Sequence, residues 1–393
     1  MKKIGIVSCY FQHNYGSMLQ AYATQMAMDE LGLENETIDI SGFNKEIKIA
    51  KLKYFAKAAL TSDILLSKIG MAKNVLRKKL SKNEYGSLSK LRHEKFNEFA
   101  KEKFNLSTPY RSITELSLKC ENNYSSVLVG SDQLWLPANI AANYYTLNFV
   151  PNSVNSVAFA TSFGQSSLPK DSRAKAKVFL TKINHIGVRE KSGQKLVQEI
   201  ANRQVPVVCD PTLLFDAKQW LEIQTPEPIE KQDYIFCYFL GSNKIHREFA
   251  KRLKAQTGYK IIALVHLDEF VKCDETYADE KPYDVDPADF LNYIKNAKYV
   301  CTDSFHCSVF STLYEKDFFT FRRYSENTKQ STNSRIDNLF DMLGIQGRLL
   351  SGDENINECL KIKTDFSAVQ KNLEQIRKFS FEYLKTALGV TNE

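Results

Sequence analysis

The chain has 393 residues, of which 43% are hydrophobic and 25% are charged, and it carries a formal net charge of +7. Since domains usually hold about 100 to 200 residues, this length and apolar content predict two domains with a core each and exclude a disordered protein. The most apolar windows are far shorter than the ~20 residues that cross a bilayer. The segment Met1 to Phe11 lacks the long apolar stretch and the cleavage site of a signal peptide, so we expect a cytoplasmic protein.

Two further features of composition limit the kinds of site. The eight cysteines include no Cys-x-x-Cys pair, and Cys209, Cys237 and Cys301 stand in apolar runs, where a thiol packs as a small hydrophobic group. A disulfide framework or a structural zinc site is therefore not expected. The positive charge is local, because residues 45–103 contain 16 Lys or Arg against 6 Asp or Glu, and the rest of the chain is slightly acidic.

The chain opens with a predicted strand, turn and helix. Lys3 to Cys9 is an apolar strand, His13 to Ser17 is a polar turn, and the helix that follows ends at Gly32. Glu36 to Ile40 is a second short strand. Alternation of strand, helix and strand predicts a parallel sheet with right-handed crossovers. The lysine-rich residues 45–103 interrupt it as an insertion of two to four amphipathic helices.

Beyond the insertion, the alternation resumes in two series. The first continues the opening sheet with Ser126 to Val129 and Ser156 to Ala160. The second predicts another Rossmann-like unit, with strands at His185 to Val188, Pro206 to Cys209, Tyr234 to Leu240, Lys260 to Val265, Tyr299 to Thr302 and Phe318 to Phe321. Helices are expected at Lys244 to Thr257 and Pro287 to Asn296, and a final amphipathic helix follows Asp365.

These elements predict an α/β fold of two Rossmann-like domains facing a cleft. The first domain spans residues 1–170, and the second spans residues 171–364. Residues 365–393 form a helix that could reach back to the first domain. Ligands of doubly wound sheets bind at the carboxyl ends of the strands, so residues at those ends are the first candidates for chemistry.

The strongest candidate is the segment Cys301 to Ser308, in which an apolar strand ends in a polar turn and a new helix begins. His306 would face the cleft, where an imidazole can give and take a proton near neutral pH, and the helix start offers free N–H groups to an anion. A capping turn with a structural histidine is an equally good interpretation of this motif alone.

A second strand end carries Gly187 to Ser192. The guanidinium of Arg189 is suited to bidentate contact with a carboxylate or phosphate. The alternative is an ordinary salt bridge to Glu190 or another nearby acid.

A third strand end carries Val129 to Trp135, which has the character of a sugar-binding edge. Asp132 and Gln133 could hold hydroxyl groups, and the indole of Trp135 could pack on a pyranose. Alternatively, Trp135 fills the core and Asp132 caps a helix. The turn at 13–17 lacks the Gly-x-Gly-x-x-Gly fingerprint, so a dinucleotide is not indicated.

Taken in order, these segments resemble the polysaccharide pyruvyl transferase family. The residues that carry the resemblance are Asn14 to Ser17, Gly130 to Gln133 with Trp135, Ser162 to Gly164, Val188 to Glu190, Asp210 to Thr212 and Thr302 to His306. The similarity covers roughly residues 3–325 without the lysine-rich insertion.

The resemblance implies a fold like that of GT-B glycosyltransferases, phosphoenolpyruvate as donor and a saccharide as acceptor, in surface or exopolysaccharide biosynthesis. By the same resemblance, the first domain is expected to form the acceptor side and the second domain the donor side. No metal and no bound cofactor are expected. His306 resembles the family's essential acid or base, and Arg189 its ligand for the anionic donor. The expected donor-binding residues are Arg189, Ser304, Phe305, His306, Arg335 and Lys329, and the expected acceptor-binding residues are Asn14, Tyr15, Gly16, Ser17, Asp132, Gln133, Trp135 and Ser162.

The sequence departs from the family pattern around the histidine. Many relatives have Arg-Leu before it and Gly after it, whereas Ser304 and Phe305 precede His306 here and Cys307 follows it. The phosphate ligand is therefore open, and Arg322, Arg323, Lys329 and Arg335 are candidates, with Arg335 favoured because it opens a helix.

The basic insertion and the activity each leave alternatives. A solvated helical face explains the lysines most simply, and no nucleic-acid motif accompanies them. The sharper hypothesis is attraction to an anionic membrane at its inner face, or to a lipid-linked acceptor. For the whole chain, a nucleotide-sugar glycosyltransferase and a non-catalytic binding subunit of a polysaccharide assembly complex remain alternatives.

Overall fold

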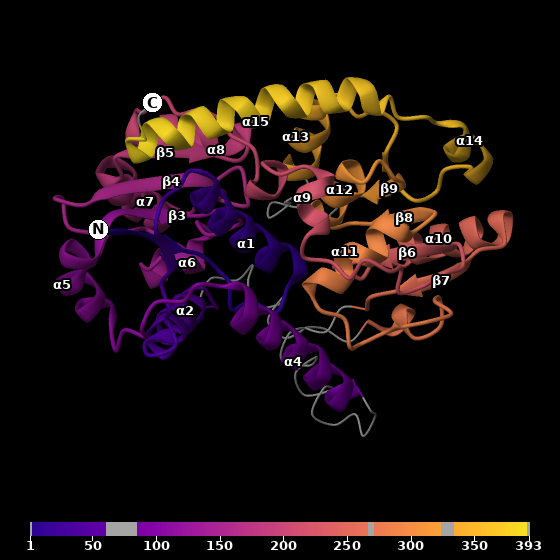
Figure 1. The fold of residues 1–393 in the computed structure, drawn as a ribbon, viewed down its shortest axis with the longest axis horizontal. Helices are drawn as coiled ribbons and strands as arrows, with labels where there is room; N and C mark the ends of the chain where they lie inside the picture. Colours follow the sequence, from indigo (N-terminus) through magenta and orange to yellow (C-terminus); the bar gives the residue numbers. More distant parts are fainter. Residues whose placement is uncertain (1, 60–84, 266–270, 324–333, 391–393) are drawn as a thin grey trace.

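The computed structural model describes residues 2–59, 85–265, 271–323 and 334–390, and two parallel sheets form its framework (Figure 1). The first sheet contains β1 (Lys3–Val7), β2 (Asn35–Thr37), β3 (Tyr124–Val129), β4 (Asn155–Thr161) and β5 (His185–Val188). The second contains β6 (Tyr234–Tyr238), β7 (Lys260–Ala263), β8 (Tyr299–Thr302), β9 (Asp317–Phe321) and β10 (Leu349–Leu350).

Helices connect the strands and cover the sheets. Those of the first half are α1 (Tyr15–Glu30), α2 (Asn44–Ala59), α4 (Tyr85–Lys103), α5 (Ile113–Asn123), α6 (Pro137–Ala142), α7 (Lys170–Lys182) and α8 (Lys191–Ala201). Those of the second half are η1 (Pro211–Leu213), α9 (Ala217–Leu221), α10 (Lys244–Thr257), η2 (Lys272–Asp274), α11 (Pro287–Asn296), α12 (Phe305–Leu313), α13 (Ser334–Leu343), α14 (Ile356–Lys361) and α15 (Phe366–Leu388).

The two sheets share one strand order. It runs β2-β1-β3-β4-β5 in the first sheet and β7-β6-β8-β9-β10 in the second, and all pairings are parallel. In the first sheet, β2 lies on one side of β1 and the later strands lie on the other side, so the connections reverse direction between β1 and β3. The same reversal occurs between β6 and β8 in the second sheet. A crevice opens at such a switch point, at the carboxyl ends of the strands. Two switch points therefore determine where a ligand can bind.

The domain boundary lies later than the strand pattern suggested. The strand His185–Val188 was expected in the second unit, but β5 pairs with β4 in the first sheet. Pro206 to Cys209 was expected to be a strand, but only Val207 forms a bridge, to Val188. Both expectations were wrong because alternation counts elements without saying which neighbour a strand pairs with. The change of sheet occurs between β5 and β6.

The long helix α15 lies across both halves of the molecule (Figure 1). Asn372 Nδ2 donates to Leu343 O at the end of α13, and Tyr383 OH donates to Ala158 O in β4, both at 3.0 Å. Its buried residues, including Leu373, join the apolar core that contains residues of both sheets. With 23 residues and 1.5 Å per residue, the helix is about 35 Å long, enough to connect the two domains.

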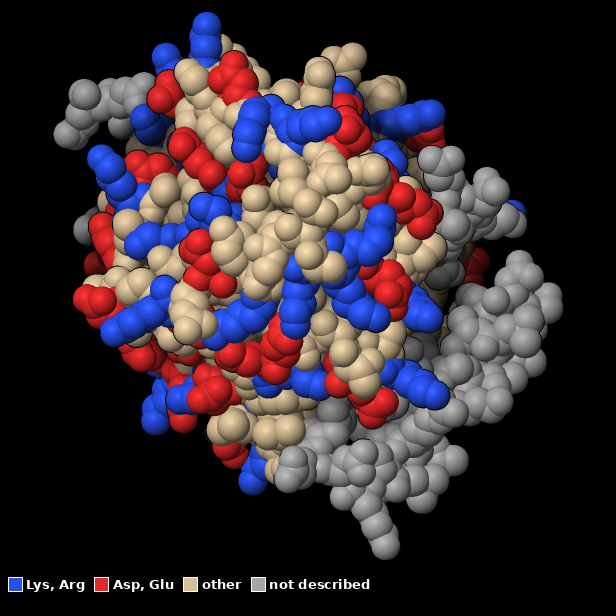
Figure 2. All heavy atoms as spheres, turned by 90° about the vertical axis from the view of Figure 1, so that its right-hand side faces the viewer, with Lys and Arg blue, Asp and Glu red and all other residues tan. Residues whose placement is uncertain are grey.

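Charge is evenly mixed on the face that ends in β7, α10 and α14. Figure 2 shows Lys and Arg side chains interleaved with Asp and Glu over this face. A nucleic-acid interface gathers positive charge on one face or stripe, and this face does not.

The core contacts of α15 can be tested by one truncation. We expect Leu373→Ala to lower the free energy of unfolding by about 2–5 kcal/mol, because the side chain is fully buried and its loss leaves a cavity. Phe379→Ala on the same helix is the control, since Phe379 is 53% exposed and its loss should cost no more than about 0.5 kcal/mol. Urea denaturation measures both variants, and equal losses would contradict the role given to Leu373.

Candidate functional site

A cavity of about 390 Å³ lies where the two switch points face each other, and we call it the switch-point cavity. Its walls include residues that follow β1, β3, β6 and β8, together with side chains of α2 and α13. The lining residues are Gln12, Asn14, Ser17, Lys51, Phe55, Asp132, Gln133, Leu134, Leu136, Ala138, Asn139, Leu240, Ser304, Phe305, His306, Arg323 and Arg335.

His306 stands in the first turn of α12 and is 6% exposed. The hydroxyl of Ser304 caps this helix by accepting from Cys307 N, which fixes the turn that carries the imidazole. His306 Nε2 lies 3.5 Å from Asp210 Oδ2. On its other side the imidazole rests on Gly16 of the first domain, where an added Cβ would lie 2.1 Å from Nδ1. The histidine is thus held between the two domains.

Arg189 follows β5 and does not face the switch-point cavity. Its Nη1 donates to Asp210 Oδ2 at 2.7 Å and lies 3.4 Å from Ser131 Oγ, and its Nε lies 3.6 Å from Glu190 Oε2. The guanidinium is 4.6 Å from the centroid of the Phe305 ring and the residue is 3% exposed. Arg189 and His306 therefore both contact the carboxylate of Asp210. Arg189 itself does not line the cavity.

Asp210 is buried and fully hydrogen-bonded. Thr212 Oγ1 donates to its Oδ1 at 2.7 Å, and Ser131 Oγ donates to its Oδ2 at 2.8 Å. Burial alone would raise the pKa of Asp210, but the charges of His306 and Arg189 outweigh burial and hold the pKa far below its ordinary value. This carboxylate is therefore ionised, and Arg189 and His306 both lie against it.

A second carboxylate, Asp132, lies on the first-domain wall. Ser17 Oγ donates to its Oδ2 at 2.6 Å. Burial would raise its pKa, but Arg189 and His306 bring it below the usual value. Its φ of 77° is costly for a residue with a side chain, and such backbone strain concentrates at functional sites.

Three cationic side chains face the cavity. Burial, and then the charge of Arg189, lower the pKa of Arg335 to about 10, while the amide oxygen of Gln133 accepts from its Nη1 at 2.9 Å. Arg323 Nη2 donates to Asp303 O at 3.0 Å, and burial lowers the pKa of Lys51. Since α12 also begins here, the cavity offers its positive charges and free N–H groups to an anion.

The structure sorts the expected acceptor-binding residues into two groups. Asn14, Ser17, Asp132 and Gln133 line the cavity, and Gly16 backs His306. The other three residues are in the interior. Trp135 is fully buried and donates to Tyr145 O, so the prediction that its indole stacks on a sugar was wrong.

The other two buried residues have structural contacts. Tyr15 donates to Val285 O and stacks on Phe290 of the second domain, so it joins the domains and does not reach a ligand. Ser162 is fully buried and donates to Glu190 at 2.6 Å. The expectation of direct acceptor contact was wrong for both, because a strand-end position does not reveal which way a side chain points.

The expected donor-binding residues lie around the same cavity with two exceptions. Ser304, Phe305, His306 and Arg335 line it, whereas Arg189 lies behind Phe305. Lys329 lies outside the described residues. Within the described ranges, no group of three or more His, Cys, Asp or Glu side chains is arranged to hold a metal ion.

Comparison with known sequences decides the relationship. The family profile described as polysaccharide pyruvyl transferase matches residues 14–324. The chain belongs to the polysaccharide pyruvyl transferase family. No curated protein matches the sequence.

The fold of this family member is shared with solved structures of other activities. A Listeria monocytogenes protein assigned as a UDP-N-acetylglucosamine 2-epimerase superposes with a TM-score of 0.54 at 10% identity, covering 99% of this chain and 98% of the other. UDP-GlcNAc 2-epimerase from Methanocaldococcus jannaschii gives 0.50 at 11% identity, covering 97% and 100%. At this identity the likeness shows the fold alone, and it is the two-domain GT-B architecture.

Several residues that line the cavity of this pyruvyl transferase family member were not predicted from the sequence, and Lys51 is the charged residue among those described. Lys51 was assigned to the solvated face of the basic insertion, yet it lines the switch-point cavity with Phe55 of the same helix. The spacing of four between them places both on one face of α2, which was the available signal. Asp210 was identified only among the residues that carry the family resemblance, and its hydrogen bonds to Ser131 and Arg189 could not be read from spacing.

The shared carboxylate can be tested with Asp210→Asn. We expect a loss of about 3–5 kcal/mol in the free energy of unfolding at neutral pH, because Arg189 would be left buried without its partner. The folded-state pKa of Asp210 lies below its unfolded value of ~3.9, so its contribution is present above that pH and is lost as the pH falls through the folded value.

The difference between wild type and variant in urea denaturation should therefore persist at pH 7 and shrink below about pH 4. Asp341→Asn, at an exposed position of α13, is the control and should change little. An Asp210→Asn protein as stable as the wild type at pH 7 would exclude the proposed ion-pair centre.

Proposed function

We propose that this protein transfers pyruvate from phosphoenolpyruvate to two hydroxyl groups of a saccharide, forming a ketal in the synthesis of a surface polysaccharide. The observation that carries the proposal is that His306 shares one cavity with Arg323, Arg335 and Lys51. Phosphoenolpyruvate is a small molecule with a phosphate and a carboxylate, and these groups require fixed positive charge. The family assignment supports a transferase.

The donor would bind on the second-domain wall. Arg335 offers a planar guanidinium suited to the carboxylate or phosphate, and the start of α12 offers backbone N–H groups beside His306. Arg323 and Lys51 complete the positive wall. Ser304 and Phe305 stand where many relatives have Arg-Leu. In this arrangement neither residue needs to bind the phosphate.

The chemistry would begin with a proton from His306 to the methylene carbon of phosphoenolpyruvate. That carbon becomes a methyl group and C2 becomes cationic, so one saccharide hydroxyl adds to C2 and loses its proton. The C2–O bond to phosphate then breaks, and the phosphate leaves with the proton of the first hydroxyl. The second hydroxyl adds to C2 and closes the ketal. Asp210 stabilises the charged imidazole of His306 before the proton transfer to carbon. The proton of the second hydroxyl then returns to His306 and restores its charged form.

The acceptor would bind against the first-domain wall. Asn14, Ser17, Asp132 and Gln133 present amide, hydroxyl and carboxylate groups to the cavity, and these are the groups that hold sugar hydroxyls. We infer that the saccharide is lipid-linked and that the enzyme works at the inner face of the membrane. None of the helices in the described part of the chain has both the length and the apolar character of a membrane crossing.

The two alternative functions make different predictions. A nucleotide-sugar glycosyltransferase needs groups that recognise a base and ribose in addition to the cations Lys51, Arg323 and Arg335 of this cavity. A non-catalytic binding subunit would be favoured if His306 or Arg189 were turned away from the cleft. His306 lines the cavity, whereas Arg189 lies behind Phe305 and contacts Asp210. Calorimetry with phosphoenolpyruvate and with common nucleotide sugars separates the donor classes, and tighter binding of a nucleotide sugar would contradict our proposal.

The role of His306 can be tested by His306→Ala. We expect ketal formation to slow by about 100-fold or more while phosphoenolpyruvate still binds, because the variant lacks the proton donor but keeps the cationic wall. The assay follows phosphate release and a pyruvate-sized mass gain on a panel of glycosides. Ketal formation at the wild-type rate would show that His306 does not move the proton.

The role of Arg335 can be tested by Arg335→Gln. We expect KM for phosphoenolpyruvate to rise by about 10-fold or more, since a hydrogen bond to a charged group contributes about 1.5–3 kcal/mol. Arg335→Lys should recover part of the affinity, and Arg111→Gln, at an exposed position, is the control. An unchanged KM in Arg335→Gln would remove Arg335 from the donor site.

A further inference from the structure

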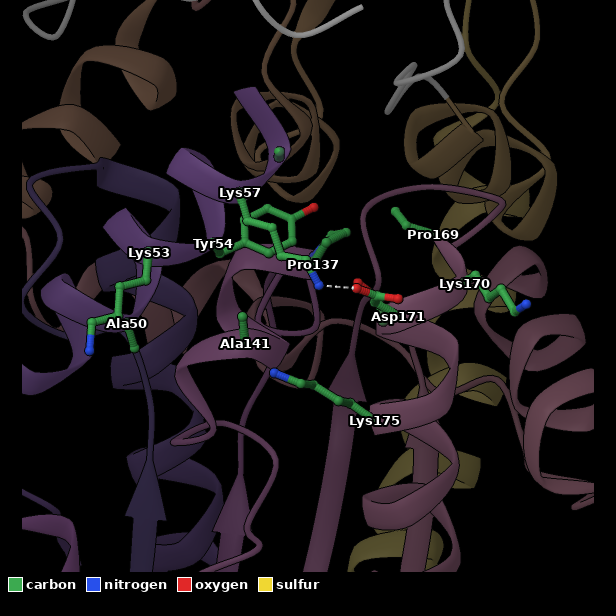
Figure 3. A pocket seen from close by; sticks show the side chains of 12 residues that line it. Ala50, Lys53, Tyr54, Lys57, Pro137, Ala141, Pro169, Lys170, Asp171 and Lys175 are labelled. Carbon is green, nitrogen blue, oxygen red and sulfur yellow. Dashed lines mark hydrogen bonds and ion pairs between the residues drawn. The ribbon is translucent and has the colours of Figure 1, made fainter. Parts of the chain in front are cut away.

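A second cavity, of about 610 Å³, lies between α2, α6 and α7 (Figure 3). We call it the lysine-rimmed cavity. Its lining residues are Ala50, Lys53, Tyr54, Lys57, Ala58, Pro137, Ala141, Pro169, Lys170, Asp171, Ser172 and Lys175. None of these residues was predicted as a site residue from the sequence.

The chemistry of this lining is amphiphilic. Tyr54, Pro137 and Ala141 give the cavity an apolar wall. Lysines surround it, and Asp171, the acid among the described lining residues, is paired with Lys57 at 2.6 Å. In Figure 3, Lys175 extends from α7 towards Ala141, while Lys170 points away from the centre. A ligand that fits has an apolar chain and a negative group.

The lysine-rimmed cavity adjoins the switch-point cavity. On α2, Ala50 and Tyr54 face the former, and the next residues in sequence, Lys51 and Phe55, face the latter. Successive residues of a helix point about 100° apart, so α2 lies between the two cavities, and a helix with its side chains is about 10–12 Å wide. Helix α6 lies between them too, since Ala141 faces the lysine-rimmed cavity and Ala138 the switch-point cavity. A molecule bound in one cavity can therefore reach the other.

The outer face of α2 is also apolar. Ile49 is 51% exposed and Leu52 is 67% exposed, and they lie among the lysines of the same helix. Exposed apolar side chains with lysines are typical of helices that rest in the interface of an anionic bilayer. This feature favours a lipid over a water-soluble anion as the occupant of the neighbouring cavity.

We propose that the lysine-rimmed cavity binds the phosphate and the adjoining apolar chain of a lipid-linked saccharide, so that the sugar extends into the switch-point cavity. This inference rests on the proposed function for its saccharide. The apolar wall would hold the first part of the chain, Lys175 and Lys53 would attract the phosphate, and α2 would set the distance between the phosphate and the modified sugar.

The test uses the full chain and geranyl phosphate, with geraniol and inorganic phosphate as the two partial ligands. We expect calorimetry to show that geranyl phosphate binds at least about 10-fold more tightly than either partial ligand, because both the chain and the charge contribute. Binding of inorganic phosphate as tight as that of geranyl phosphate would overturn the proposal, as would no binding of geranyl phosphate.

Two variants locate the binding. Lys175→Glu should weaken geranyl phosphate by about 10-fold or more, because it replaces attraction with repulsion, and Ala141→Trp should do the same by filling the cavity. Lys177→Glu is the matched control, since Lys177 is exposed two positions further along α7 and points to the opposite side. Circular dichroism checks that each variant is folded. Because one variant changes the charge and the other fills the space, each tests the site by itself.

The outcome is separate from that of the proposed function. Geranyl phosphate binding is measured without phosphoenolpyruvate, whereas pyruvyl transfer is measured on the wild type with water-soluble glycosides. Equal affinity of Lys175→Glu, Ala141→Trp and wild type for geranyl phosphate would place the lipid elsewhere, even if ketal formation is observed.

Discussion

The site depends on the buried carboxylate of Asp210, which lies between Arg189 and His306. Asp210 accepts from Arg189 on one side and lies beside His306 on the other, with both residues almost free of solvent contact. Removing a carboxylate from water is unfavourable unless charge and hydrogen bonds compensate for it, so the three groups stabilise one another's positions. Because Arg189 follows a strand of the first sheet and His306 follows one of the second, the same interaction joins the domains at the chemically important point.

Much of the fold could be predicted from the sequence. The apolar runs that became β3, β4, β6 and β8 are buried on both sides, and such strands stand out as continuous apolar segments. Pairing between strands could not be predicted in the same way. The strand His185–Val188 joins β4 because its partner is fixed by packing in three dimensions, and nothing in its own residues distinguishes the first sheet from the second.

The sequence predicted which strand ends form the site better than it predicted what each side chain contacts. Strand ends in both sheets converge on the switch-point cavity, as the carboxyl-end rule requires, and Ser304 to His306 lie there. The direction of each side chain was beyond that rule. Trp135 and Tyr15 turn inward to fill the core and the domain junction, whereas Lys51 turns inward from a segment whose composition indicated solvent exposure. An inserted helix can thus complete a cavity that the sheets begin.

The bare backbone of Gly16 against the imidazole of His306 has a thermodynamic consequence. The two surfaces fit because no methyl group stands between them, so the imidazole is seated only while the domains are in contact. A molecule that touches both walls binds the protein more tightly when the domains are in contact than when they are apart. Its binding therefore shifts the population towards the state with the domains in contact, by that difference in affinity. Occupancy by a ligand that bridges the two walls would then keep the imidazole of His306 in place.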